Sequence, residues 1–225
     1  MIKTKVITTD DVLVMLCTAV SKVLSAATGT HVAYSPVVQK IGRTCLRPDI
    51  GCFVLFDGGF AGLVVINFSG AAALEIYRAY MRGMGMAEYE LSVRHTSDDV
   101  GNTLGELMNQ IVGDFTGRVG KELMLNINQN QPKMLTINRE VIVSIDTNLD
   151  RPQARRVAFT TAQRNVFYLE LAMDRTELIK LHDFVAKDND PDQILEEQSH
   201  RPTPPANPPA PSTSSEMDLL DELGL

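Results

Sequence analysis

The sequence predicts one α+β domain, in which long helices pack on an antiparallel sheet, followed by a tail without a fold of its own. Three observations lead to this fold class. Apolar residues recur at helical spacing in several long segments. A Gly-rich turn at 57–59 separates two apolar, strand-like runs. After residue 187 the chain becomes acidic and then rich in proline. Helices interleaved with hairpins are typical of layered α+β domains. The expected organisation is a domain over 1–187, a disordered linker over 188–213 and a short peptide over 214–225.

The composition is that of a globular domain with an acidic surface. The chain has 225 residues, of which 44% are hydrophobic and 22% charged, and a formal net charge of −7. Nucleic acid is therefore not expected as a partner, because phosphate binding needs concentrated Lys and Arg. Three cysteines without a pairing pattern predict buried, reduced thiols, and four scattered histidines predict no metal site.

The N-terminus predicts a cytoplasmic protein. Residues 1–5 lack the apolar core of a signal peptide, and no run is expected to approach membrane-spanning length. We therefore expect no membrane partner.

The elements follow from local signals, taken in chain order. A first helix is expected from Thr9, as N-cap, to a stop at Gly29. The Asp57-Gly58-Gly59 turn predicts a hairpin of strands 52–56 and 63–68. A second helix is expected at 71–84 and a third from 98, capped by Thr96 or Ser97. The remaining predicted elements are strands at 31–35, 43–47, 122–129, 139–146, 154–161 and 166–173, and a last helix at 175–187.

The third helix has two distinct faces. Its predicted buried face consists of apolar residues at helical spacing, namely Val100, Leu104, Leu107, Met108, Ile111, Phe115 and Val119. At about 100° per residue, Asn102, Glu106, Asn109 and Gly113 share a narrow stripe on the opposite side. Gly113 and Gly117 offer a surface that a partner's backbone could approach closely. A Glu and an Asn three residues apart are also common on an ordinary solvated face, so the pair alone does not identify a site.

The tail ends in a segment suited to docking. Residues 201–211 contain six prolines, which predicts an extended linker. Met217, Leu219, Leu220 and Leu223 lie among acidic residues and can share one face of a short helix after Ser214 or Ser215. The alternative is a disordered tail with a fortuitous leucine triplet.

These residues carry two resemblances. With Glu106, Asn109 three residues later and Pro132 twenty-three after that, residues 9–186 resemble the CheX branch of the CheC/CheX/FliY phosphatases, which dephosphorylate the chemotaxis regulator CheY. The family has Asp or Ser where this chain has Asn102. The acidic, Leu-Leu, acidic, Leu-Gly ending is similar to the regulator-binding C-terminus of CheZ, an unrelated phosphatase of CheY.

The resemblances imply a function and a division of roles. The chain would dephosphorylate the phospho-aspartate of a CheY-like response regulator, with Asn109 placing the attacking water in line and Glu106 pairing with the receiver's active-site Lys. Asn102, Gly113 and the tail leucines would contact the partner. Pro132 would constrain a turn or the start of a strand rather than contact the partner. The chain would need no cofactor of its own, since the receiver carries its own Mg²⁺.

A non-enzymatic alternative stays open at this point. The domain could bind a receiver domain, or join a flagellar or chemoreceptor assembly, without hydrolysis, and Asn102 in place of Asp or Ser favours this interpretation. The sequence leaves open which regulator is cognate and whether the protein is a homodimer.

Overall fold

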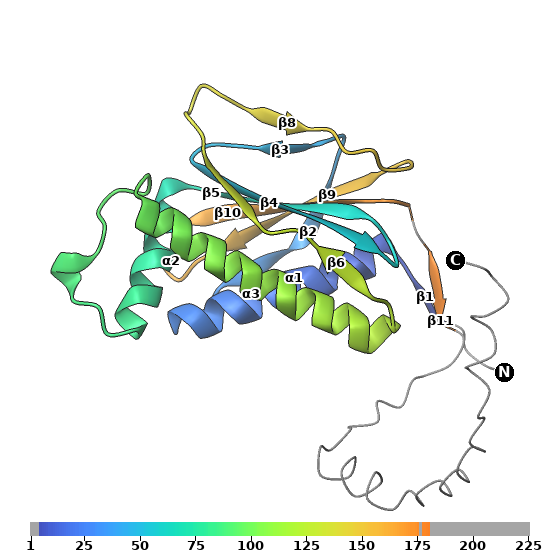
Figure 1. Ribbon diagram of the computed structural model, residues 1–225, viewed down its shortest axis with the longest axis horizontal. Helices are drawn as coiled ribbons and strands as arrows, with labels where there is room; N and C mark the ends of the chain where they lie inside the picture. Colours follow the sequence, from blue (N-terminus) through green and yellow to red (C-terminus); the bar gives the residue numbers. More distant parts are fainter. Residues whose placement is uncertain (1–4, 176, 181–225) are drawn as a thin grey trace, which may run out of the picture. The chain divides into compact units, whose positions relative to one another are not determined.

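The computed structural model describes residues 5–175 and 177–180. It is an α+β fold in which three helices cover one face of an antiparallel sheet, as the sequence predicts (Figure 1). The helices are α1 (Thr9–Thr28), α2 (Gly70–Gly83) and α3 (Asp98–Leu123), with a short 3-10 helix η1 (Glu88–Glu90) between the last two. The strands are β1 (Lys5–Ile7), β2 (Ala33–Ile41), β3 (Thr44–Leu46), β4 (Ile50–Gly58), β5 (Gly62–Phe68), β6 (Ile127–Gln129), β7 (Lys133–Thr136), β8 (Val143–Ile145), β9 (Gln153–Thr160), β10 (Val166–Met173) and β11 (Leu178–Lys180).

The main sheet has the strand order β2-β9-β10-β5-β4-β6, and β7 pairs with β4 beside β6. All of its pairings are antiparallel. Two small sheets, β1 with β11 and β3 with β8, complete the described fold. Because side chains alternate along a strand, β5 sends Val64 and Ile66 toward the helices, and Leu63 and Val65 toward β3 and β8 on the other face.

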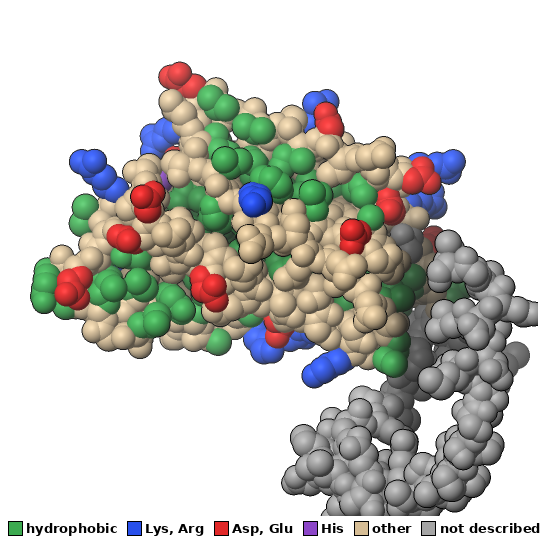
Figure 2. All heavy atoms as spheres, viewed as in Figure 1, with side chains coloured by type: hydrophobic (Ala, Val, Ile, Leu, Met, Phe, Trp, Pro, Cys, Tyr) green, Lys and Arg blue, Asp and Glu red, His purple; other side chains and the backbone are tan. Residues whose placement is uncertain are grey.

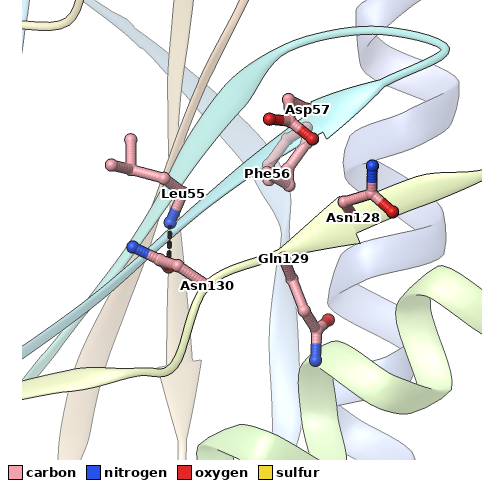
Figure 3. Close-up of a pocket in the computed structure, with 6 residues that line it drawn as sticks. All are labelled: Leu55, Phe56, Asp57, Asn128, Gln129 and Asn130. Carbon is pink, nitrogen blue, oxygen red and sulfur yellow. Dashed lines mark hydrogen bonds between the residues drawn. The ribbon is translucent and has the colours of Figure 1, made fainter. Parts of the chain in front are cut away.

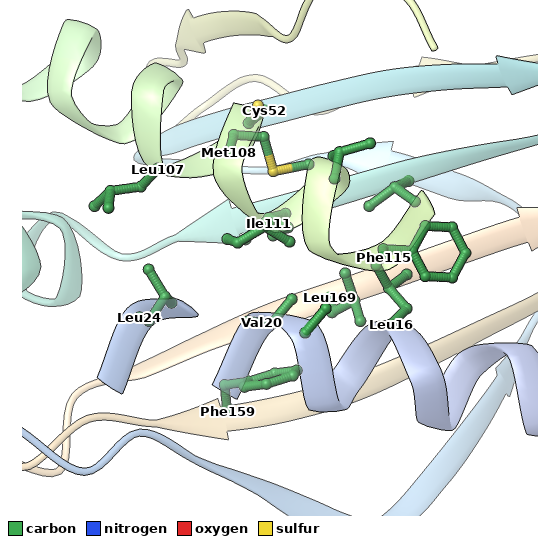
Figure 4. Packing of buried hydrophobic residues seen from close by; sticks show 14 of the residues in the cluster. Leu16, Val20, Leu24, Cys52, Leu107, Met108, Ile111, Phe115, Phe159 and Leu169 are labelled. Carbon is green, nitrogen blue, oxygen red and sulfur yellow. The ribbon is translucent and has the colours of Figure 1, made fainter. Parts of the chain in front are cut away.

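The main core lies between the helices and the sheet. Leu16, Val20 and Leu24 of α1 pack in one cluster with Ile111 and Phe115 of α3 on the helix-covered face of the sheet, each at most 1% exposed (Figure 4). Full burial of this kind stabilises the fold by about 1.5–3 kcal/mol per large apolar side chain. The core therefore fixes which face of α3 points inward.

The first helix differs from expectation in two respects. Its N-cap is Thr8 rather than Thr9: the Thr8 hydroxyl accepts from the Asp11 amide, and Asp11 Oδ2 accepts from the Thr8 amide at 2.8 Å. It ends, as predicted, at Gly29 in the left-handed conformation. Among the described residues, α1 is also the one helix long and apolar enough to cross a membrane by length and composition, so the expectation that no run approaches that length was wrong. In the fold, most of its apolar side chains pack in the core, while Val14 is exposed.

The predicted hairpin and second helix are confirmed, while several boundaries are wrong. The strand expected at 122–129 begins only at Ile127, because α3 continues to Leu123. Strands β1 and β7 were not predicted. The helix expected at 175–187 is wrong at 178–180, which form β11 and pair with β1. The rest of that segment, the linker 188–213 and the peptide 214–225 with Leu219, Leu220 and Leu223 lie outside the described residues.

Two polar groups hold β3 on the outer face of the sheet. Glu170 of β10 is fully buried and accepts from the Arg156 guanidinium at 2.6 and 2.8 Å and from the Cys45 amide at 2.9 Å. Asn67 of β5 accepts from the Arg47 amide and donates to the Cys45 carbonyl. A buried carboxylate is tolerated only when it is paired and hydrogen-bonded in this way.

The three cysteines are free and buried, as the sequence predicts. Burial raises the pKa of the Cys17 and Cys52 thiols to about 12. A thiol with so high a pKa is uncharged at neutral pH and is a poor nucleophile. Neither thiol is therefore suited to covalent catalysis.

Candidate functional site

Helix α3 presents its two faces as the sequence predicts. All seven residues of the expected apolar stripe are buried. The helix begins after Ser97, with Asp98 and Asp99 in its first turn, where negative charge favours the helix dipole. Since the apolar stripe is held in the core, the opposite stripe faces outward.

The polar row lies on this outward stripe. Asn102, Glu106, Asn109 and Gly113 are all exposed. Glu106 Oε1 accepts from Gln110 Nε2 at 3.3 Å. Within the described residues, the side-chain amides of Asn102 and Asn109 have no hydrogen-bond partner, so both are free to bind a ligand or a water molecule.

Three residues of this row, Asn102, Glu106 and Asn109, line a groove of about 480 Å³ between α3 and β7. Met134 and Thr136 of β7 line the opposite side, together with Pro132, which immediately precedes the strand. The complete lining is Thr96, Ser97, Asp98, Gly101, Asn102, Gly105, Glu106, Asn109, Pro132, Met134 and Thr136. Three of the predicted site residues, Asn102, Glu106 and Asn109, therefore share one cleft with Pro132.

The helix and the strand lie close together at Gly105 in this groove. A Cβ atom added at Gly105 would lie 3.6 Å from Met134 Cγ, which is ordinary van der Waals contact. One turn earlier, a Cβ at Gly101 would meet nothing within 4 Å. The groove is therefore narrow near Gly105 and open toward the start of α3.

Gly113, the remaining predicted contact residue of the domain, lies on the same face but outside the groove lining. A Cβ at Gly113 or at Gly117 would meet nothing within 4 Å. Packing within the described domain thus does not require glycine at either position. Each glycine weakens the helix relative to alanine. Close approach of another molecule to this surface would explain why glycine is present at both positions.

Asp114 fixes the far half of α3 against α1. Its carboxylate accepts from Lys22 of α1 at 2.5 Å and from Arg118 of α3 at 2.6 Å. Burial raises the pKa of Asp114, but the hydrogen bonds from Lys22 and Arg118 outweigh this effect and hold the pKa below its usual value. The carboxylate is therefore ionised at neutral pH and serves the helix packing.

Sequence reasoning missed the β7 side of the groove. Met134 and Thr136 belong to a four-residue strand that has too little alternation to be recognised on its own. Pro132 does precede a strand, as expected, but it also lines the groove, which the sequence did not predict. Asp98, the first residue of α3, also lines the groove, which the sequence did not predict.

The groove is suited to positioning rather than to covalent chemistry. It contains two carboxylates and two free amides, and no Cys, His or Lys among its lining residues. Figure 2 shows the face over α3 with isolated acidic side chains on a surface that is mostly backbone and uncharged side chains. Such a set can hold a water molecule and pair with a cation of a partner. The hydroxyls of Thr96, Ser97 and Thr136 also line the groove, but among the described residues none of them is hydrogen-bonded to a carboxylate that could act as its base.

A second pocket, of about 400 Å³, lies between β4 and β6 (Figure 3). Its lining includes Asp57, Asn128, Gln129 and Asn130, and none of the predicted site residues. The Asn130 side chain accepts from the Leu55 amide at 2.9 Å, and the Asn130 amide donates to the Leu55 carbonyl at 3.1 Å. Both the side-chain oxygen and the backbone N–H of Asn130 are therefore used in extending the sheet ladder and are not available to bind a ligand.

Chemotaxis proteins of known structure share this fold. CheX from Desulfovibrio desulfuricans matches with a TM-score of 0.59 at 16% identity, over 73% of this chain and 99% of that one. CheX from Vibrio vulnificus matches with a TM-score of 0.60 at 14% identity, over 73% and 99%. A chain of the CheX-CheY-BeF3-Mg²⁺ complex from Borrelia burgdorferi matches with a TM-score of 0.55 at 15% identity, again over 73% and 99%. At these identities the likeness shows a CheX/CheC-like fold.

One family model, described as "Protein of unknown function (DUF3334)", matches residues 3–225. No functionally curated protein matches the chain.

Proposed function

The chain belongs to the DUF3334 family and has a CheX/CheC-like fold, and from this we propose that it dephosphorylates the phospho-aspartate of a CheY-like response regulator in the cytoplasm. The observation that carries the proposal is the groove between α3 and β7, where Asn102, Glu106 and Asn109 meet Pro132. A CheX of the same fold was crystallised with CheY, beryllofluoride and Mg²⁺, which supports a CheY-like partner.

The reaction needs little beyond placement. An aspartyl phosphate on a receiver domain is already reactive, and the receiver supplies its own Mg²⁺. The free amide of Asn109 can accept a hydrogen bond from a water molecule through its oxygen while its nitrogen donates toward the phosphoryl group. Water attacks phosphorus, the P–O bond to the aspartyl carboxylate breaks, and inorganic phosphate leaves. No covalent intermediate on this chain is required.

Glu106 has the second role in this proposal. It lies one turn before Asn109 on the same exposed stripe, so the two side chains reach the partner together. Pairing with the receiver's active-site Lys would fix the helix in register over the phosphoryl group. The hydrogen bond from Gln110 holds one carboxylate oxygen of Glu106 in place.

The C-terminal peptide belongs to the proposal as a tether. Leu219, Leu220 and Leu223 would bind the regulator weakly and raise its concentration near the groove. This element rests on the sequence alone, because residues 214–225 lie outside the described residues.

The decay of phosphorylated receiver, with and without the protein, tests the proposal. We expect wild-type protein to accelerate the decay and Asn109→Ala to lose the acceleration by roughly 100-fold or more, because a misplaced water reacts slowly. Asn128→Ala is the matched control, since it removes an exposed amide outside the groove. Equal acceleration by folded Asn109→Ala protein would refute the assigned site.

A non-catalytic adaptor is the second candidate function. Asn102 stands in the groove where the CheX family has Asp or Ser, and it cannot carry a charge. Receiver binding by the wild type without any acceleration of decay would establish the adaptor instead.

A further inference from the structure

Strand β7 has one free edge, and this edge borders the groove. Within residues 5–175 and 177–180, β7 pairs with β4 alone. Its Met134 and Thr136 line the groove opposite the polar row of α3. A strand edge next to a binding cleft can pair with an extended segment of another chain.

The hydrogen-bond phase of β4 shows which backbone groups of β7 are free. In an antiparallel ladder, directly opposite residues alternate between bonded and non-bonded pairs. Ile137 donates to the carbonyl of Asp49 at 2.9 Å, and Asn130 donates to that of Leu55 at 3.1 Å. Both acceptors are odd-numbered residues. The odd-numbered residues between Asp49 and Leu55 therefore direct their backbone N–H and C=O groups toward the same edge, where β7 lies.

Gly51 and Phe53 therefore bond toward β7. Their opposite residues are Leu135 and Lys133, which form the bonded pairs. The amides and carbonyls of Met134 and Thr136 consequently point away from β4, out of the sheet edge. Their side chains lie on the same face as Cys52 and Ile50, toward α3.

Free edges are usually protected from unwanted pairing, and β7 has only modest protection. It is four residues long, follows Pro132 and begins with Lys133, and both a proline and a charge discourage aggregation. Among the described residues, the outward backbone groups of Met134 and Thr136 have no hydrogen-bond partner, and both residues line the groove together with Gly105 and Glu106.

We propose that an extended backbone segment of the receiver-domain partner adds to the free edge of β7, pairing with the amides and carbonyls of Met134 and Thr136. The proposal rests on the proposed function, because it assigns the same groove a way of holding the same partner. Backbone pairing would set the register of the receiver along the groove, so that its phosphoryl group arrives at Asn109.

The charge of the groove favours a receiver domain over the other molecules that could pair with the edge of β7. The groove contains the carboxylates of Asp98 and Glu106. A second copy related by a two-fold axis would bring the same carboxylates to this edge, and the chain's own tail would bring Glu216, Asp218, Asp221 and Glu222. A receiver domain brings its active-site Lys, which has the complementary charge.

Residue-resolved amide exchange tests the pairing directly. In the free protein, we expect the amides of Lys133 and Leu135 to be protected and those of Met134 and Thr136 to exchange rapidly. Addition of CheY-like receiver with beryllofluoride and Mg²⁺ should protect Met134 and Thr136. Protection that appears without receiver and grows with protein concentration would mean that a second copy occupies β7, and would overturn the proposal.

A pair of proline variants separates pairing from chemistry. Thr136→Pro removes an outward amide, which an edge strand tolerates. It should raise KM for phosphorylated receiver by roughly three- to tenfold, the effect of one lost hydrogen bond, with kcat within about twofold. Gln129→Pro makes the same change on β6, at an outward position of the same sheet edge outside the groove, and should alter neither constant. If Thr136→Pro fails to fold, amide exchange of the wild type decides alone.

The outcomes distinguish this inference from the proposed function. Accelerated decay without protection of Met134 and Thr136 would overturn the strand pairing and leave the phosphatase proposal intact. Protection without accelerated decay would support the pairing and refute hydrolysis. Neither effect with any CheY-like receiver of the source organism would overturn both.

Discussion

The exposed glycines of α3 allow separate predictions for stability and for contact with the partner. Glycine within a helix costs about 1 kcal/mol relative to alanine. At Gly113 and Gly117 an added Cβ meets nothing within 4 Å, so no packing cost offsets this gain. We therefore expect Gly113→Ala and Gly117→Ala each to raise the free energy of unfolding by about 1 kcal/mol, or Tm by about 2–4 °C.

Denaturant unfolding measures this gain as a higher midpoint with an unchanged slope. Gly62→Ala is the matched control. Its Cβ would collide with the Phe56 ring and lie 2.8 Å from the Ala172 carbonyl, so this variant should lose stability. A loss of stability in Gly113→Ala would show that this face of α3 is not open, and the reasoning would be wrong.

The same positions test contact with the partner. Gly113→Gln projects a long side chain from the exposed face, where a docked receiver would have to lie against the helix. We expect KM for phosphorylated receiver to rise while kcat and the fold are retained. Unchanged KM for this variant would remove Gly113 from the proposed contact surface.

Four further predictions follow from particular residues. Glu106→Lys should weaken receiver binding more than Glu106→Ala, because it places like charges together; equal affinity by calorimetry would refute the proposed ion pair. Leu107→Asp should unfold the domain, since it puts a charge at a site that is 1% exposed, at a cost of several kcal/mol; a cooperative thermal transition at the wild-type Tm would mean that the helix is rotated. The pKa of Asp114 is lower in the folded protein than in the unfolded chain, so its ionised form stabilises the fold above the unfolded pKa, and this contribution is lost as pH falls through the folded pKa. Asp114→Asn should therefore lower the free energy of unfolding at neutral pH and make it decrease less steeply in acid. Parallel pH profiles of the two proteins would contradict this. Deletion of 188–225 should leave the domain folded and kcat unchanged but raise KM, and the isolated peptide 214–225 should compete with the full chain; unchanged kinetics together with a peptide that binds no receiver would assign the tail another partner.

The two faces of α3 and the β4–β5 hairpin could be predicted from the sequence because their signals are local. Helical periodicity places Leu107 and Phe115 inward and Glu106 and Asn109 outward before any neighbour is known, and the structure has them so. The turn at Asp57-Gly58-Gly59 likewise separates two long apolar strands. In these elements periodicity and turn chemistry carry the information, and each depends on residues close in the chain.

Three of the short strands were not predicted, and the cause is tertiary. Strands β1, β7 and β11 have three or four residues, too few for a pattern, and each forms because a distant partner offers a ladder. The segment 178–180 was expected to be helical, but it pairs with residues 5–7 at the other end of the domain. A propensity is a weak local preference, and such pairing outweighs it.

The sequence by itself thus determined the polar row Asn102, Glu106 and Asn109 and its exposure, because one helix and its periodicity contain all of that information. Only the tertiary structure decided that this row is one wall of a groove. The other wall, with Pro132, Met134 and Thr136, is placed by the pairing of β7 with β4 and by the approach of α3 at Gly105. The register between strands distant in the chain is set by the hydrogen-bond ladder and the shared core, and neither is encoded in a local pattern.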